Sequence, residues 1–307
     1  MGRQVALTGA TGFIGQSLCA LLMERGYSVR ALVRSREKAA RLPSGIEPNP
    51  GSLQDPASLE CLLEGADAVI HLAGSVRGNS EAEFMAVNRA GTEALLAAAE
   101  SVAPAARFLH VSSLAAREPQ LSWYSLSKRA GEERVMASGL DWIVLRPPAI
   151  YGPGDEEMRA IFDWMARGIA LVPGAIESRT SLLHVDDLVR ALEACLDRRV
   201  ATGQVFELGD DKSGGYDWRE MATIAGAVYG RDVRLWPVPA ALLNTVAALS
   251  LGLGRLTGRS AMLTPPKLRE LRFENWVADN RAITEATGWM PRISLHDGLL
   301  ALADAAL

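Results

Sequence analysis

The sequence predicts an α/β fold, in which a doubly wound parallel sheet carries helices on both faces and a smaller, mostly C-terminal α/β lobe follows. Two observations predict this. Over the first 150 residues, short apolar runs alternate with amphipathic segments, which is typical of strands and helices that follow one another along a chain. After Tyr151 this alternation loosens, and from Gly209 the chain becomes rich in Gly, Trp and Pro. Right-handed helical crossovers would join the parallel strands of the first part.

The individual elements follow from the spacing of apolar residues. Short continuous apolar runs predict buried strands, and apolar residues three or four apart predict helices. The expected strands cover residues 5–8, 28–33, 68–72, 107–111 and 142–145, and the expected helices cover 15–25, 36–41, 57–63, 83–100 and 125–136. Helices at 156–167 and 188–196 and strands at 182–185 and 205–208 come later. We expect a first domain over 1–150 with return segments at about 180–208, and a second lobe over 151–179 and 209–307.

The bulk composition excludes several classes of protein. The chain has 307 residues, of which 22% are charged, and a formal net charge of -4. A sizeable core is therefore expected, and nucleic acid is not expected as a partner. Cys19, Cys61 and Cys195 lie far apart in apolar stretches, which predicts buried thiols rather than disulfides or a metal site. The N-terminus shows no signal-peptide pattern, so we expect a cytoplasmic protein, with membrane association left open by an apolar segment discussed below.

Three glycines between the first strand and the first helix predict a dinucleotide site. Gly9, Gly12 and Gly15 stand at three-residue intervals, with Thr11, Phe13 and Ile14 between them. The first allows a sharp turn, the second lets a pyrophosphate approach the backbone, and the third lets helix and strand pack closely. The helix N-terminus then offers N–H groups to the phosphates. This context predicts a Rossmann domain.

The end of the second strand indicates which dinucleotide is bound. Rossmann folds often place an acidic residue there, about 20 positions after the glycines, for the ribose 2′-hydroxyl. This chain instead has Arg34, followed by Ser35 and Arg36. A guanidinium suits a 2′-phosphate in charge and geometry. We therefore expect NADP, with NAD as the alternative if Arg34 stacks on the adenine.

Tyr124 and Lys128 form a candidate acid–base pair. They lie four residues apart at the start of a predicted helix, so they share one helical face. A free tyrosine has a pKa near 10, and a nearby ammonium is expected to lower it. The pair follows Val111, Ser112 and Ser113 at a predicted strand end.

Taken together, these motifs resemble the extended short-chain dehydrogenase/reductases, the NAD-dependent epimerase/dehydratase family. The matching segments are residues 8–15, 71–74, 87–92, 111–113, 124–128, 146–154 and 184–187. They occur in the family's order over about two thirds of the chain. The resemblance implies an enzyme in which Ser113 holds the substrate oxygen, Tyr124 exchanges the proton and Lys128 binds the nicotinamide ribose.

The resemblance also implies cofactor contacts elsewhere. The residues expected to flank the cofactor are Leu72, Ala73, Gly74, Val111, Pro147 and Ile150. Ser52 and Leu53 lie where the family often has Asp-Leu, so a carboxylate near the adenine is missing. Asn88 would be either a helix cap or a site residue. For His184, Asp186 and Asp187 we favour a structural role, at a strand end and a helix N-terminus where the two lobes meet.

The second lobe gives weaker indications about the substrate. The interval from Ser113 to Tyr124 is short for this family, which speaks against a sugar nucleotide. Arg179 is a single candidate for holding a diphosphate and could equally form an ion pair between the lobes. Phe273, Trp276 and Trp289 are expected to pack the second lobe. Residues 237–254 carry no charge.

This apolar segment, taken as residues 238–258, has three open interpretations: a lid over an apolar substrate, a buried helix, or a helix that contacts a membrane. Basic residues follow it, which would suit an anionic surface. Together with residues 263–271, it resembles two branches of the superfamily, the hydroxysteroid dehydrogenases and the nucleotide-binding accessory subunit of respiratory complex I.

The leading hypothesis is an NADP-dependent oxidoreductase that moves hydride to or from a carbonyl or secondary alcohol of a small or apolar substrate. One alternative is a sugar-nucleotide epimerase or dehydratase. Another is a non-catalytic NADP-binding scaffold or assembly factor. The sequence leaves the oligomeric state open, with a homodimer as one alternative by analogy with the family that it resembles.

Overall fold

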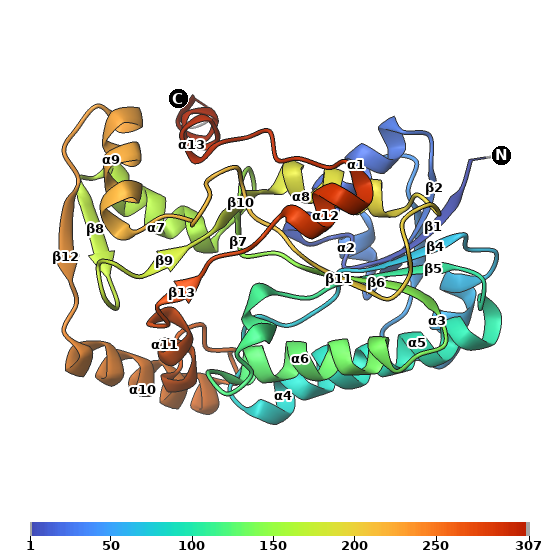
Figure 1. Ribbon diagram of the computed structural model, residues 1–307. Coiled ribbons are helices and arrows are strands. Elements are labelled where there is room, and N and C mark those ends of the chain that lie inside the picture. Colours follow the sequence, from blue (N-terminus) through green and yellow to red (C-terminus); the bar gives the residue numbers. More distant parts are fainter. Residues whose placement is uncertain (1, 305–307) are drawn as a thin grey trace.

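The computed structural model describes residues 2–304, and its centre is a seven-stranded parallel sheet (Figure 1). The strand order is β11-β6-β5-β4-β1-β2-β3. The strands are β1 (Gln4–Thr8), β2 (Ser28–Val33), β3 (Glu47–Pro50), β4 (Ala68–His71), β5 (Arg107–Val111), β6 (Asp141–Arg146) and β11 (Gln204–Glu207). Because β1 pairs with β2 on one side and β4 on the other, the winding reverses at β1. A ligand site is expected at that switch point, and the predicted Rossmann fold class is confirmed.

Helices cover both faces of the sheet (Figure 1). One face carries α3 (Pro56–Leu63), α5 (Gly91–Val102) and α6 (Trp123–Met136), and the other carries α1 (Phe13–Glu24), α8 (Val185–Cys195) and α12 (Arg281–Thr287). The short α2 (Arg36–Ala39) follows β2. Alternation along β1 produces the two layers, because Val5 and Leu7 join one apolar core and Ala6 joins the other.

Strand β3 was not predicted from the sequence. It reads Glu-Pro-Asn-Pro, and prolines are depleted in strands because they cannot donate to a ladder. The strand lies at the edge of the sheet and pairs only with β2, where missing donors cost little. Asn49 is buried, and its side chain donates to the Ser58 carbonyl at 2.8 Å, which ties β3 to α3.

The second lobe lies beyond the carboxyl end of β6 (Figure 1). Its strand pairs are β7 (Ala149–Tyr151) with β10 (Leu182–His184), β8 (Ile169–Val172) with β12 (Arg234–Pro237), and β9 (Arg179–Thr180) with β13 (Asn275–Trp276). The helices α7 (Glu157–Ala166), α9 (Trp218–Tyr229) and α13 (Leu295–Asp304) enclose a separate apolar core that includes Tyr151, Phe162 and Met165.

Four residues differ from expectation or refine it. Trp289 packs in the core shared by α1 and α8, not in the second lobe, since α12 returns to the sheet. Cys61 is exposed, because it lies on the outer face of α3. His184 accepts a hydrogen bond from the Asp186 backbone at the start of α8, as the structural interpretation predicted. Asp187 is fully buried and accepts from the backbone N–H groups of Arg292 and Ile293, each at 2.9 Å.

Helix α10 (Ala240–Thr257) is the apolar segment noted in the sequence. By length and composition it could cross a membrane, and only 17% of it is buried. The interpretation as a buried core helix is therefore wrong. The helix lies beside α11 (Pro265–Leu271) at the lower edge of the second lobe (Figure 1).

Candidate active site

The glycine turn joins β1 to α1 in the geometry that the sequence predicted. Gly9 has φ of 78°, and the Gly12 N–H donates to the Gly9 carbonyl at 3.0 Å. A Cβ on Gly15 would lie 2.2 Å from that carbonyl oxygen, so only glycine fits there. A Cβ on Gly12 would meet one atom within 4 Å, the Gly9 oxygen at 3.3 Å. The remaining space above Gly12 is open to a ligand.

The first turn of α1 has free backbone donors. Gly12 is the N-cap residue, and no side chain caps this helix. A helix start without a cap leaves N–H groups for an anion. Thr11, Phe13 and Ile14 are partly exposed beside it. The turn therefore fits a pyrophosphate, by its uncapped N–H groups and by the absence of side chains at Gly9 and Gly12.

Arg34 lies at the carboxyl end of β2, beside the switch point. It is exposed, and no ion pair involves it anywhere in residues 2–304. Ser35 is occupied in capping α2, since its hydroxyl accepts from the Lys38 backbone. Arg34 is thus a free cation at the position where Rossmann folds often carry an acid.

A buried chain of hydrogen bonds links Thr8, which precedes the glycine turn, to Thr92 in α5. The Ala73 N–H donates to Thr8 Oγ1 at 3.2 Å, and Thr8 Oγ1 lies 2.7 Å from His71 Nδ1. His71 Nε2 lies 3.0 Å from Thr92 Oγ1, which donates to the Asn88 carbonyl. Since Thr92 already donates, His71 carries its proton on Nε2 and accepts at Nδ1. Burial, with the charge of Lys128, lowers the pKa of His71 to about 3, so it stays neutral.

Asn88 belongs to the site wall and is not a helix cap. It lies in η1 (Ala86–Ala90), a π-helical turn between α4 (Glu81–Met85) and α5. Its side chain accepts from the Ser75 N–H at 2.7 Å and donates to Ser127 Oγ at 2.8 Å. The capping alternative is wrong because the helical run begins earlier, after Ser80. π-helical turns of this kind often mark functional sites.

The burial of His110 predicts that the free energy of unfolding falls measurably at acid pH. It is buried, neither ring nitrogen has a hydrogen-bond partner within the described chain, and burial lowers its pKa well below the usual value. Below pH 6.5 the unfolded chain takes up a proton that the folded chain refuses, so the free energy of unfolding falls as pH falls. The volume-conserving His110→Leu variant should lose about 1 kcal/mol less than wild type between pH 6.5 and 5.5.

Urea denaturation at the two pH values measures this difference. Asp210, whose pKa burial raises to about 6, acts in the opposite sense, but it does so equally in both proteins. An identical pH dependence in the variant would mean that His110 is not held neutral.

Lys128 lies beneath the end of β5. It is 6% exposed, and its Nζ donates to the Val111 carbonyl at 2.8 Å. Burial lowers its pKa to about 8, partly offset by Glu132. A Cβ on Gly74 would come within 3.7 Å of this ammonium. Gly74 therefore lies beside the Lys128 ammonium, while Leu72 and Ala73 pack against the two apolar cores of the sheet.

Tyr124 lies in the first turn of α6, which Ser122 caps. Burial raises its pKa, Ser113 lowers it less strongly, and Glu270 and Glu157 raise it further. This differs from the expectation that Lys128 would lower the pKa. The reason is that loss of solvation outweighs the other effects in this apolar setting. Ser113 itself caps a 3₁₀ turn, where its hydroxyl accepts from the Ala115 N–H.

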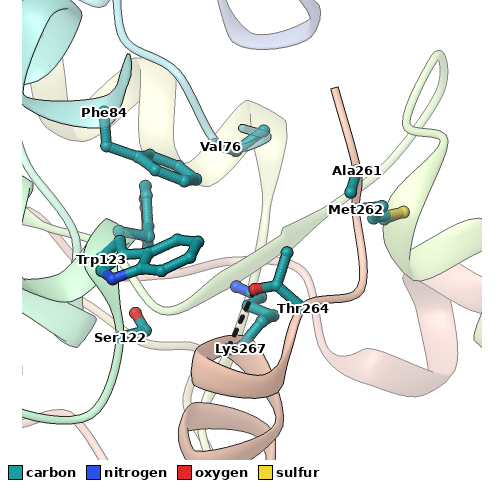
Figure 2. Close-up of a pocket in the computed structure, with 9 residues that line it drawn as sticks. Val76, Phe84, Ser122, Trp123, Ala261, Met262, Thr264 and Lys267 are labelled. Carbon is teal, nitrogen blue, oxygen red and sulfur yellow. Dashed lines mark hydrogen bonds between the residues drawn. The ribbon is translucent and has the colours of Figure 1, made fainter. Parts of the chain in front are cut away.

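A tight apolar cavity borders Tyr124. Figure 2 shows Phe84 and Trp123 on one side, with Val76, Ala261, Met262 and Thr264 across from them. The cavity measures about 10 Å³, on the order of the space for one water. The Lys267 ammonium lies 5.1 Å from the Tyr124 ring centroid. A larger substrate can occupy this cavity only if some of its lining residues move.

Sequence reasoning missed a polar network behind this cavity. Glu270 is 8% exposed and accepts from the Ser122 hydroxyl at 2.5 Å and the Ser125 hydroxyl at 3.3 Å. Its other oxygen accepts from Lys267 at 2.5 Å. This network fixes the start of α6, and with it Tyr124, against α11. Ser122 and Glu270 are 148 positions apart, and no local pattern indicates their pairing.

The remaining predicted residues surround these groups. The Leu114 N–H donates to the Pro147 carbonyl at 2.8 Å, which joins that residue to the Ser113 turn. Ile150 packs partly against the sheet core. Leu53 packs in the core against Gly91, and Ser52 forms a local network with Ser58.

Arg179 is already paired. It bonds to the carbonyls of Gly214 and Gly215 and to Glu220 at 3.0 Å. All of these partners belong to the second lobe, so the pair does not join the lobes. Arg179, the residue considered from the sequence as a diphosphate ligand, therefore already has hydrogen-bond and ion-pair partners.

Fold and site define a class: a Rossmann-fold enzyme that uses a nicotinamide dinucleotide. The model of the NAD dependent epimerase/dehydratase family matches residues 5–209, and this chain belongs to that family. The resemblance drawn from the sequence is confirmed, as is the expectation of an enzyme.

Similar proteins include reductases. The chain is 38% identical over 302 residues to a ceramide reductase of Caulobacter vibrioides (strain NA1000 / CB15N), covering 98% of this chain and 93% of that protein. It is 29% identical over 331 residues to the 4-hydroxy-2-methyl-3-oxo-4-farnesyl-3,4-dihydroquinoline-1-oxide ketoreductase of Stigmatella aurantiaca, covering 97% and 95%. The structure of MoeE5 with UDP-glucuronic acid and NAD matches with a TM-score of 0.76 at 22% identity, over 100% of both chains; at that identity the match shows the shared fold alone.

Proposed function

We propose that this enzyme is an NADP-preferring reductase that acts on a carbonyl of an apolar, lipid-like substrate. The observation that carries the proposal is the group of apolar side chains at Tyr124, namely Val76, Phe84, Trp123 and Met262, which share the cavity wall with Ser122, Thr264 and Lys267. A sugar diphosphate needs cations, but Arg179 is engaged by Glu220 and Lys267 by Glu270. The ceramide reductase relative, similar over almost the whole of both chains, supports a long-chain lipid as the substrate class.

The chain's own residues suit such a reduction. When bound, the nicotinamide supplies the hydride. Tyr124 donates the proton to the carbonyl oxygen, and the Ser113 hydroxyl donates a hydrogen bond to the same oxygen. Lys128, held by the Val111 carbonyl, binds the cofactor ribose. One carbonyl, one hydride and one proton give one secondary alcohol.

Tyr124 carries the proton that a carbonyl reduction requires. Burial raises its pKa, so the phenol is protonated at neutral pH in the protein without cofactor.

Arg34 should set the preference for the phosphorylated cofactor. In Arg34→Ala, we expect NADPH affinity to fall at least about tenfold, since a charge-assisted pair is lost, while NADH affinity changes little. Fluorescence titration of both cofactors with both proteins measures this. Arg36→Ala, on the adjacent helix α2, is the matched control. Wild-type protein that binds NADH as tightly as NADPH would contradict the preference.

Turnover tests the reaction itself. Purified enzyme should consume NADPH, followed at 340 nm, when a long-chain keto lipid of the ceramide class is presented in detergent micelles. One alcohol should form for each NADPH consumed. Interconversion of a UDP-sugar without net consumption of NADPH would instead support an epimerase and contradict the proposal.

A further inference from the structure

Helix α10 presents an apolar stripe to the outside of the molecule. The stripe consists of Leu242, Val246, Leu249, Leu253 and Leu256, whose exposed fractions are 54%, 45%, 62%, 61% and 85%. Their spacing of four, three, four and three places them on one helical face. Contiguous exposed apolar surface of this kind usually marks an interaction site.

The opposite face of α10 is anchored to the protein. Ala247 and Gly254 are buried, and a Cβ on Gly254 would lie 2.5 Å from Asn79 Oδ1. The Asn79 side chain donates to the Arg259 carbonyl at 3.0 Å and accepts from the Ala261 N–H at 3.0 Å. The stripe is therefore held facing outward by the chain itself.

The segment that carries the stripe has basic residues but no acidic ones. Between Val233 and Arg269 the sequence has no acidic residue and five basic ones: Arg234, Arg255, Arg259, Lys267 and Arg269. Of these, Lys267 is paired with Glu270. The whole chain, in contrast, carries a net charge of -4. Arg255 and Arg259 are exposed, and neither pairs with a carboxylate in the part of the chain that the structure describes. This charge is complementary to an anionic surface.

The stripe borders a groove that adjoins the candidate active site. Val246, Leu249 and Leu253, together with Met262, line this groove of about 610 Å³. Ala261 and Met262 line both the groove and the cavity at Tyr124, so this segment separates the two spaces. An acyl chain lying in the groove would reach the Tyr124 phenol once this segment moves.

Two other occupants fit the surface less well. A second copy of this chain would bring the same acid-free segment against itself, with arginines facing arginines. A membrane-spanning position would require α10 to leave its contact with Asn79. A helix lying in the plane of the interface keeps that contact.

We propose that α10 and the loop after it dock on an anionic phospholipid surface, with the apolar stripe at the headgroup–acyl boundary and Arg255 and Arg259 at the headgroups. A lipid substrate then passes along the groove to Tyr124 without crossing water. Docking goes beyond the proposed reduction, because it requires neither cofactor nor turnover.

Sedimentation of the full chain with sucrose-loaded vesicles tests the docking. Phosphatidylcholine vesicles are compared with vesicles that also contain phosphatidylglycerol, and no substrate is present. We expect stronger binding to the anionic vesicles, which rising salt weakens. Leu249→Asp with Leu253→Asp should reduce binding at least about tenfold on both. Arg255→Gln with Arg259→Gln should reduce binding to the anionic vesicles about fivefold per arginine.

Leu300→Asp is the matched control, since Leu300 is 43% exposed on the distant helix α13; its binding should equal that of wild type. Thermal melting of each variant verifies folding. Wild-type protein that stays in the supernatant, or leucine variants that bind as wild type does, would overturn the proposal. So would light scattering that shows a dimer dissociated by Leu249→Asp, because the stripe would then be an interface between copies.

Discussion

Replacing Tyr124 with phenylalanine should lower kcat for carbonyl reduction by about three orders of magnitude, because the proton donor is lost. The Phe84 ring packs edge-on against Tyr124 with centroids 6.4 Å apart, and the Lys267 ammonium lies over the Tyr124 ring. Phenylalanine preserves these ring contacts. NADPH affinity and the melting temperature should therefore stay close to those of wild type.

Stopped-flow NADPH oxidation measures kcat, fluorescence titration measures NADPH affinity, and thermal melting measures stability. Tyr229→Phe, in α9 of the second lobe, is the control that removes a tyrosine hydroxyl elsewhere and should turn over normally. Near-wild-type turnover by Tyr124→Phe would exclude the proton-donor role. A cell in which Tyr124→Phe replaces the wild type without consequence would favour the scaffold alternative.

The features that the sequence predicted are those that depend only on residues close together in the chain. The three glycines need only a strand before them and a helix after them, and Tyr124 and Lys128 share one helical turn. The missed strand β3 and the π-helical turn at Asn88 break local rules, since prolines oppose strands and apolar spacing does not reveal an extra residue in a turn. In the structure β3 pairs with β2, and Asn88 bonds to Ser75 and Ser127; both sets of partners lie outside the local segment.

The substrate side was least predictable because it is built from contacts between distant segments. Glu270 meets Ser122 only when α11 folds against α6, and Met262 reaches Tyr124 only because Asn79 holds the preceding loop. For α10, composition indicated an apolar helix. It could not indicate that most of the helix would remain exposed, since that depends on what packs against it.

Gly15→Ala should be the most damaging single-methyl change in the cofactor-binding domain. The new Cβ would lie 2.2 Å from the Gly9 oxygen and 2.6 Å from the Ala10 Cα. Both are backbone atoms of the turn, so no side chain can move aside to relieve the overlap. We expect a loss of about 3 kcal/mol in the free energy of unfolding. In Gly139→Ala, where the added Cβ meets nothing within 4 Å, the change should stay within about 0.5 kcal/mol.

Gly12→Ala separates packing from ligand binding in the same turn. Its Cβ would meet only the Gly9 oxygen, at 3.3 Å, so the free energy of unfolding should change by less than about 1 kcal/mol. The methyl group would, however, fill the space through which a pyrophosphate approaches the helix start. NADPH affinity should fall by about a hundredfold, equivalent to roughly 2.7 kcal/mol. Urea denaturation and calorimetric titration of Gly12→Ala and Gly15→Ala measure both quantities. Wild-type affinity in a folded Gly12→Ala protein would mean that the dinucleotide does not pass over Gly12, and that the turn serves the packing of α1 on β1 alone.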